Sequence, residues 1–162
     1  MAYKIFIVED EQLIAESLQD ILEVLEHKVI GIADNGKDAI AAISKSNPDL
    51  ILLDIQIKGN MDGIEVAERI KENSKAPFIF TTAFADSETI TRAKDKGPYG
   101  YVVKPYGIND IKVAIEIAIS NAKAFNELKE NSENLSFEGS HHLFIKTDSR
   151  LVKLKDEDIL YI

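Results

Sequence analysis

The sequence contains no cysteine. This absence excludes disulfides, thiolate metal sites and cysteine nucleophiles, and it fits the reducing cytoplasm, where we expect the protein to act. Long apolar runs are also absent. No stretch approaches membrane-spanning length, and residues 1–4 lead into a strand pattern without the layout of a signal peptide. We therefore predict no contact with a membrane.

Positive charge is scarce. The chain has 19 basic and 28 acidic residues, so its formal net charge is −9. Such a chain is a poor nucleic-acid binder as it stands, because binding to phosphate backbones depends on clustered lysine and arginine. The hydrophobic share of 45% is typical of a globular chain, and 162 residues allow one ordinary domain with an appendage.

Strand patterns alternate with helical periodicity over residues 3–120. Four successive aliphatic residues, Leu50 to Leu53, are typical of a strand buried on both faces. The alternation predicts an α/β fold, a doubly wound parallel sheet covered by helices on both faces. The strands are expected at 4–8, 29–33, 50–53, 77–82 and 100–103. The helices are expected at 11–26, 37–44, 64–73, 86 to about 97, and 108 to about 130. Their periodicity places Leu13 on the inward face of the first helix and Phe125 on the inward side of the last.

The character of the chain changes near residue 131. Residues 131–140 have the composition of a linker, and strand patterns at 142–146 and 150–154 flank a turn, which predicts a C-terminal β-hairpin. A hairpin alone is marginally stable in water. We therefore expect a main domain at 1–122, a helix extension and linker at 123–140, and at 141–162 the incomplete start of a β-rich output domain.

Polar and charged side chains follow four of the predicted strands. In open α/β sheets, ligands bind outside the carboxyl ends of the strands, so these side chains should lie together. Each has an ordinary explanation by itself, such as a helix cap, an acid favoured by a helix dipole or a surface lysine. Their joint occurrence at successive strand ends favours a chemical centre. The residues are Glu9, Asp10, Asp54, Thr82 and Lys104.

This set of groups has a defined chemical capability. Three clustered carboxylates repel one another, and Mg²⁺ relieves that repulsion while it accepts waters and a phosphate oxygen. Lys104 supplies a positive charge and Thr82 a hydroxyl donor. Together with the metal they can neutralise the charge of a phosphoryl group while the carboxylate of Asp54 attacks it in line.

Four motifs carry a family resemblance: Val8-Glu9-Asp10-Glu11, Leu52-Leu53-Asp54, Thr82-Ala83 and Gly100-Tyr101-Val102-Val103-Lys104-Pro105. Together they resemble the signature of the receiver domain of two-component response regulators, over about residues 3–120. The resemblance implies a five-stranded flavodoxin-like sheet and a cytoplasmic protein of phosphorelay signalling. It also implies that the chain is no ordinary enzyme, with only Mg²⁺-dependent self-phosphorylation and slow autodephosphorylation.

The resemblance also implies the phosphoacceptor and the metal ligands. Asp54 would accept a phosphoryl group from a sensor histidine kinase. Mg²⁺ would be held by Glu9, Asp10, Asp54 and the backbone carbonyl of Gln56, with Asp10 the more direct of the two acids after the first strand.

The remaining roles follow from the same resemblance. Thr82, the Ala83 amide and Lys104 would bind the phosphoryl oxygens, and the bond from Lys104 to Pro105 would be cis. Tyr101 would be the aromatic switch that follows Thr82. The surface of the fourth helix, strand 100–103 and the last helix would then form a possible homodimer contact, with Tyr99 and Tyr106 as candidates.

The loop after Asp54 departs from the family pattern. The family usually has Met-Pro before the Asp-Gly pair, whereas this chain has Ile57-Lys58-Gly59-Asn60-Met61-Asp62-Gly63, without proline and about one residue longer. The departure bears on the local metal geometry and on the dephosphorylation rate.

The C-terminal residues have a separate resemblance. Residues 143–154 and 158–162 are similar to the start of a LytTR-type DNA-binding domain, which implies control of transcription. Residues 121–162 hold more acidic than basic side chains. This fragment therefore has no electrostatic footprint for DNA, and we expect DNA contacts only from residues beyond Ile162.

Three other functions compete with this interpretation. A phosphohydrolase with Asp54 as nucleophile commonly has a second acid two residues later, where this chain has Gln56. A flavin or nucleotide domain would need a Gly-rich phosphate loop after the first strand, where Glu9-Asp10-Glu11 stands instead. A receiver-like adaptor that is never phosphorylated should lack one of the site residues, and none is missing.

The three histidines do not cluster with the acids in the sequence pattern. His27 is expected to end a helix, where a positive charge is favourable. His141 and His142 are expected in the linker region. We assign chemistry to none of them.

Overall fold

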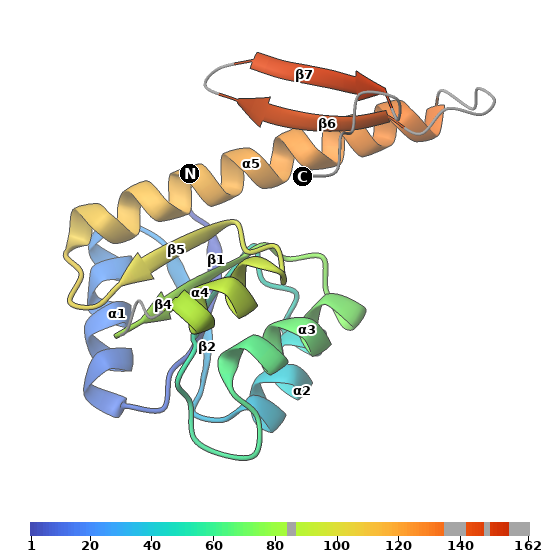
Figure 1. Cartoon of the computed structure of the whole chain (residues 1–162). Coiled ribbons are helices and arrows are strands. Elements are labelled where there is room, and N and C mark those ends of the chain that lie inside the picture. Colours follow the sequence, from blue (N-terminus) through green and yellow to red (C-terminus); the bar gives the residue numbers. More distant parts are fainter. Residues whose placement is uncertain (84–86, 135–141, 148–149, 156–162) are drawn as a thin grey trace. The chain divides into compact units, whose positions relative to one another are not determined.

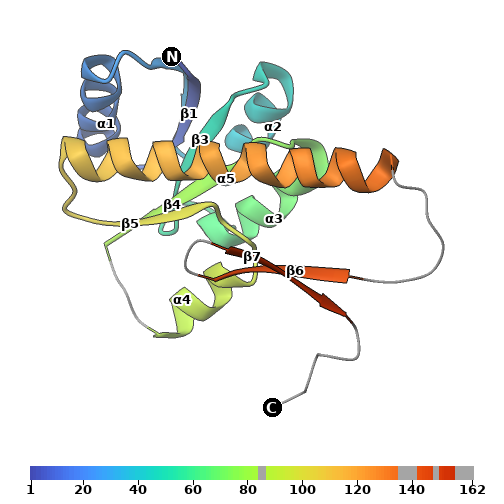
Figure 2. The ribbon, with the colours of Figure 1, turned by 90° about the horizontal axis from the view of Figure 1, so that it is seen from above.

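Five parallel strands form one sheet in the order β2-β1-β3-β4-β5. Figure 2 shows β1, β3, β4 and β5 side by side. The predicted five-stranded parallel sheet with helices on both faces, the flavodoxin-like receiver fold, is thereby confirmed. The strands are β1 (Lys4–Val8), β2 (Lys28–Ala33), β3 (Leu50–Asp54), β4 (Phe78–Thr82) and β5 (Gly100–Val103).

This computed structural model describes residues 1–83, 87–134, 142–147 and 150–155. Predictions that fall on residues 84–86, 135–141, 148–149 and 156–162 lie outside the described residues. The chain divides into two units, residues 1–126 and 127–162. The first unit holds the whole parallel sheet, and the predicted division at residues 122 and 140 stays a prediction.

Five helices connect the strands or follow them. The last of these was predicted to end near residue 130, with a linker from 131, but it continues to Asn134. The linker prediction for residues 131–134 was therefore wrong. Asn and Ser in this segment are only mildly unfavourable to a helix, and neither Gly nor Pro occurs there. The helices are α1 (Gln12–Val24), α2 (Gly36–Ser46), α3 (Gly63–Asn73), α4 (Ser87–Lys94) and α5 (Ile108–Asn134).

Each face of the sheet has its own hydrophobic core, because successive side chains of a strand point to opposite faces. Ile5 and Ile7 of β1 pack with α1 and α5, whereas Phe6 and Val8 pack with α2, α3 and α4. Figure 1 shows α1 on one side of the strands and α2 and α3 on the other. The side chains of β3 from Leu50 to Leu53 are all buried, as their unbroken apolar run indicates.

Two helical residues are exposed to solvent, although the apolar periodicity predicted that they face the core. Leu13 was placed on the inward face of α1, but it is 80% exposed. The buried residues of α1 are Ala15, Leu18 and Leu22, a stripe that leaves Leu13 on the far side of the helix. Phe125 was also placed with the inward side of α5, yet it is exposed. Among the residues of α5 up to 130, whose burial the structure describes, Ala122 is the last buried one.

The second unit contains a pair of antiparallel strands, β6 (His142–Thr147) and β7 (Arg150–Lys155). Their register runs from His142 opposite Lys155 to Thr147 opposite Arg150. This pairing confirms the predicted hairpin, whereas the output domain that it was expected to open stays a prediction. Among the described helices, none has both the length and the apolar character that crossing a bilayer requires.

Candidate functional site

The acidic residues of the candidate site lie where the strand order changes direction. β1 pairs with β2 on one side and with β3 on the other, so the chain leaves β1 and later returns to its opposite edge. A crevice forms at such a switch point, outside the carboxyl ends of the two strands. Glu9 and Asp10 directly follow β1, and Asp54 is the last residue of β3.

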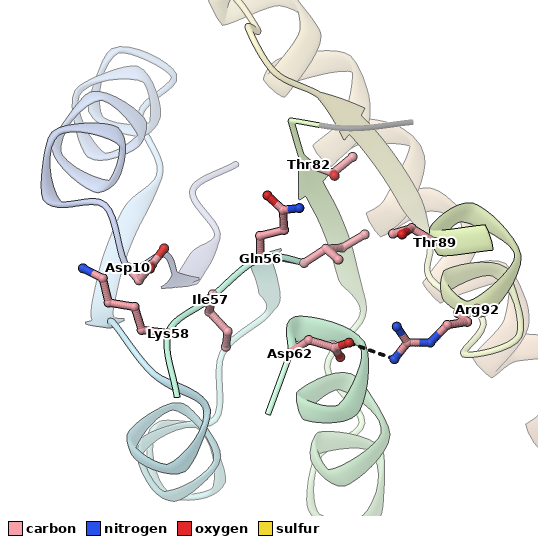
Figure 3. A pocket seen from close by; sticks show the side chains of 9 residues that line it. Asp10, Gln56, Ile57, Lys58, Asp62, Thr82, Thr89 and Arg92 are labelled. Carbon is pink, nitrogen blue, oxygen red and sulfur yellow. Dashed lines mark hydrogen bonds and ion pairs between the residues drawn. The ribbon is translucent and has the colours of Figure 1, made fainter. Parts of the chain in front are cut away.

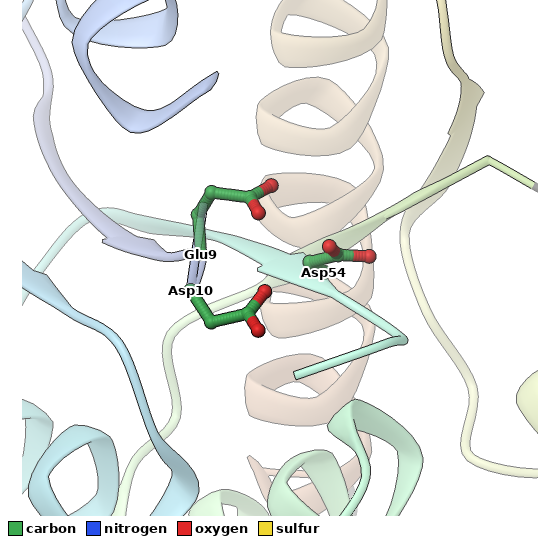
Figure 4. Close-up of side chains that lie close together, drawn as sticks. All are labelled: Glu9, Asp10 and Asp54. Atoms are coloured by element: carbon green, nitrogen blue, oxygen red, sulfur yellow. The ribbon is translucent and has the colours of Figure 1, made fainter. Parts of the chain in front are cut away.

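Three carboxylates converge there. One oxygen each from Glu9, Asp10 and Asp54 lies within 4.8 Å of the others, and Figure 4 shows the three side chains close together. Glu9 is 2% exposed and Asp54 is 3% exposed, whereas Asp10 is partly accessible. The chain therefore concentrates negative charge at a largely buried point, which is costly without a cation.

Lys104, which follows β5, supplies one such cation. Its Nζ donates to Glu9 Oε2 at 2.8 Å and to Asp54 Oδ2 at 2.9 Å. Burial disfavours the charged form of Lys104, but the hydrogen bonds to Glu9 and Asp54 and the negative charges of these acids together outweigh that effect and raise the pKa of its ammonium group. Burial, together with repulsion from Asp54, raises the pKa of Glu9 despite the contact with Lys104.

Backbone amides fix the other oxygens of the two buried acids. The Glu11 N–H donates to Glu9 Oε1 at 3.1 Å, and the Gln56 N–H donates to Asp54 Oδ1 at 3.1 Å. Each of these carboxylates is thus held on one oxygen by an amide and on the other by Lys104. Such hydrogen bonds orient the carboxylates before any ligand binds.

A cavity of about 460 Å³ opens beside the acidic cluster. Asp10, Gln56 and Thr82, three residues predicted from strand ends and motifs, contribute to its lining. Figure 3 shows these side chains around the cavity. Ala83 follows Thr82 and is exposed. The remaining lining residues are Ile55, Ile57, Lys58, Asp62, Thr89 and Arg92.

The longer loop between β3 and α3 is held at both ends. The Gly63 N–H donates to the Ile55 carbonyl at 2.8 Å, and Lys58 pairs with Asn35 in an isolated parallel bridge. Asp62 caps α3 by accepting from the Glu65 N–H at 2.9 Å, while Glu65 accepts from the Asp62 N–H in return. The absence of the family's proline therefore does not leave this loop unanchored.

The residues of the predicted switch region lie on β5 and directly beside it. Tyr101 on β5 is half-buried and packs edge-on against Phe80, with ring centroids 6.1 Å apart. The Lys104–Pro105 peptide bond is cis. Tyr99 and Tyr106, the aromatic candidates for a dimer contact, are partly buried against the core shared by α1 and α5.

More exposed apolar side chains lie on β5 and α5. Val113 is 52% exposed and Ile117 is 51% exposed. Together with Val103 they line a groove of about 590 Å³. This groove, rather than the two tyrosines, offers accessible apolar surface on the face that was expected to make a dimer contact.

Sequence reasoning missed the contribution of α4 to the cavity. Thr89 and Arg92 line it from that helix, although neither lies at a strand end. The three-residue spacing places both on one face of a helix, and this was the only signal available. Which face of α4 turns toward the cavity depends on the tertiary packing.

His27 differs from its expected setting. It lies three residues beyond the end of α1, beside β2, and not in the helix. Its Nδ1 accepts from the Tyr3 N–H at 3.4 Å. Burial and the nearby amino terminus lower its pKa, and Glu116 opposes this. The expectation of a favourable helix-end cation was therefore wrong.

The comparisons with known proteins identify the family. Residues 5–116 match the model of the response regulator receiver domain. The chain belongs to this family. The receiver domain of a modulated diguanylate cyclase from Desulfovibrio desulfuricans G20 has the same fold, with a TM-score of 0.73 and 38% identity, covering 76% of this chain and 98% of that one.

Curated relatives of this receiver chain include transcriptional regulators. It is 33% identical to the transcriptional regulatory protein PdtaR of Mycobacterium tuberculosis over 82% of this chain and 64% of the relative. It is 27% identical to the sensory transduction protein LytT of Bacillus anthracis over 98% of this chain and 65% of the relative. The chain thus spans slightly less than two thirds of these relatives' length.

Proposed function

We propose that this receiver domain is a phosphorylation switch in which Asp54 accepts a phosphoryl group from a sensor histidine kinase. The observation that carries the proposal is the convergence of Asp54 with Glu9, Asp10 and Lys104 at the switch point of the sheet. A nucleophilic carboxylate, two further acids and a cation are the groups that phosphoryl transfer requires.

In the proposed step, a carboxylate oxygen of Asp54 attacks the phosphorus of a phosphohistidine. A new P–O bond forms to Asp54, the P–N bond breaks, and the histidine ring leaves with the bonding electron pair. Lys104, already 2.9 Å from Asp54 Oδ2, would neutralise part of the phosphoryl charge. Thr82, buried at the end of β4 and lining the cavity, would donate its hydroxyl to a phosphoryl oxygen, next to the Ala83 amide.

The donor set fits Mg²⁺. Hard oxygen ligands from Glu9, Asp10 and Asp54 lie close enough to share one ion, and we assign the backbone carbonyl of Gln56 as a further ligand. When bound, the ion would offset the negative charge of the acids and of the transferred group. Asp10, the most accessible of the three acids, would be its more direct ligand.

Phosphorylation would then shift the domain between two states. Thr82 and Lys104 would be drawn toward the new charge, and Tyr101, packed on Phe80, would follow Thr82. We infer that the altered face of α4, β5 and α5 forms a homodimer contact. Control of transcription is the output that the named regulators among the relatives support.

Intact mass spectrometry tests the proposal. Incubation of the chain with acetyl phosphate and Mg²⁺ should add a single phosphoryl group, and chelation of the metal should prevent it. Asp54→Asn should abolish the adduct, whereas Asp20→Asn, which removes an exposed acid on α1, should leave it unchanged. If the wild type gains no adduct under any condition, the switch proposal fails, and the alternative is a receiver-like adaptor that is not itself phosphorylated.

A further inference from the structure

The helix α4 (Ser87–Lys94) has little buried surface. Of its eight residues only Ala93 is buried. Two ion pairs tie this part of the chain to α3 and its cap: Arg92 Nη2 lies 2.8 Å from Asp62 Oδ2, and Lys96 Nζ lies 3.0 Å from Glu68 Oε1. The position of α4 therefore depends on partners that a new charge can draw away.

Only one of the two ion pairs borders the cavity beside the acidic cluster. Arg92 lines that cavity together with Asp10, Thr82 and Gln56, and Figure 3 shows its guanidinium reaching Asp62 at the rim. Lys96 does not line that cavity and instead lines a separate small cleft between α3 and α4. Of these two cations, Arg92 alone is placed to respond to a charge that enters the cavity.

The contact of Arg92 with Asp62 is weak enough to be exchanged. The Arg92 side chain is about half-exposed and that of Asp62 about one-third exposed, and ion pairs in such settings contribute at most about 1 kcal/mol. A phosphoryl group carries a charge of about −2 and three acceptor oxygens, against −1 for a carboxylate. Asp62 is fixed by its reciprocal cap with Glu65, so Arg92 is the mobile partner.

We propose that Arg92 is a second phosphoryl-binding cation of this site, which exchanges Asp62 for the phosphoryl oxygens when Asp54 is modified. A guanidinium group has five N–H donors in a planar fork that matches phosphate oxygens. The exchange would stabilise the phosphorylated state and release α4 from the α3 cap. It thus couples the chemistry at Asp54 to the position of α4. The inference rests on the proposed function, because it requires a phosphoryl group at Asp54.

The test measures the affinity of the full chain for beryllofluoride, a phosphoryl mimic, in the presence of Mg²⁺ by calorimetry. Arg92→Gln should weaken this affinity roughly tenfold, as expected for the loss of a hydrogen bond to a charged group. Arg92→Lys should retain part of the affinity that Arg92→Gln loses. Lys96→Gln is the matched control, because it breaks the other ion pair to α3, which lies outside the cavity. The affinity of this variant for beryllofluoride should stay within about twofold of wild type.

Asp62→Asn should change the affinity for beryllofluoride in the direction opposite to Arg92→Gln. Asparagine still caps a helix well, but it removes the charge that competes for Arg92, so beryllofluoride should bind more tightly than to wild type. If Arg92→Gln binds as tightly as Lys96→Gln, or if Asp62→Asn weakens binding, the role of Arg92 is refuted while the phosphoacceptor stands. If wild type itself binds no beryllofluoride, the proposed function is what fails.

Discussion

The ammonium group of Lys104 lies 2.9 Å from Asp54 Oδ2, so a cation that follows the edge strand β5 reaches the acid at the end of the central strand β3. The same ammonium also contacts Glu9. One positive charge therefore serves a cluster of three carboxylates. The site retains an excess of negative charge that a bound divalent cation would balance.

This excess predicts that Asp10→Asn stabilises the metal-free protein. Removing one of three neighbouring negative charges should raise the free energy of unfolding by on the order of 1 kcal/mol, because Asp10 is only partly buried. Mg²⁺ should raise the free energy of unfolding of the wild type above its value in EDTA, but it should not raise that of the variant. Urea unfolding in EDTA and in Mg²⁺ measures both effects. Asp20→Asn is the control, and a variant less stable than wild type in EDTA would contradict the argument.

Gly63 is predicted to be essential at the start of α3. A Cβ at this position would lie 1.9 Å from the backbone oxygen of Asp54, so β3 or α3 would have to shift. Gly63→Ala should destabilise the domain by about 3 kcal/mol and impair phosphorylation of Asp54. Gly107→Ala is the control, because its nearest atom would be 3.7 Å away. Gly107 directly precedes α5, where alanine caps a helix poorly, so this variant should lose about 1 kcal/mol at most. Urea unfolding distinguishes the two, and equal effects would show that the contact at Gly63 is relieved at no cost.

The lowered pKa of His27 predicts that the protein loses stability in acid. Burial lowers its pKa from the usual value of 6.5, so the folded protein binds this proton less readily than the unfolded chain does. Its contribution to stability is therefore present above pH 6.5 and is lost as the pH falls through the lower, folded pKa. Urea unfolding from neutral to mildly acidic pH should show wild type losing more stability than His27→Gln. Parallel curves for the two proteins would exclude this role.

The exposed groove on β5 and α5 predicts a dimer contact that depends on phosphorylation. Val113→Glu places a charge among the apolar side chains of that groove and should prevent dimerisation in the presence of Mg²⁺ and beryllofluoride. Leu13→Glu changes a still more exposed apolar residue on α1 and should leave dimerisation unaffected. Sedimentation velocity measures the association. A dimer that persists in Val113→Glu would place the contact elsewhere on the domain.

Much of the fold follows from local patterns that the sequence contains by itself. The unbroken apolar run from Leu50 to Leu53 indicates a buried strand without knowledge of its neighbours, and the alternation of strands and helices predicts a parallel sheet. Asp54 and Lys104 could be proposed as site residues because each follows a predicted strand. The ends of parallel strands share one edge of the sheet, so their meeting follows from strand direction alone.

Other features required the tertiary structure. The order β2-β1-β3-β4-β5 brings Glu9 and Asp54 to neighbouring strands and lets Lys104 contact both. The exposure of Leu13 depends on which face of α1 meets the sheet. Arg92 has no strand end to mark it and reaches the cavity only because α4 packs beside α3. Periodicity determines which residues share a face of an element, but the packing of elements determines what that face contacts.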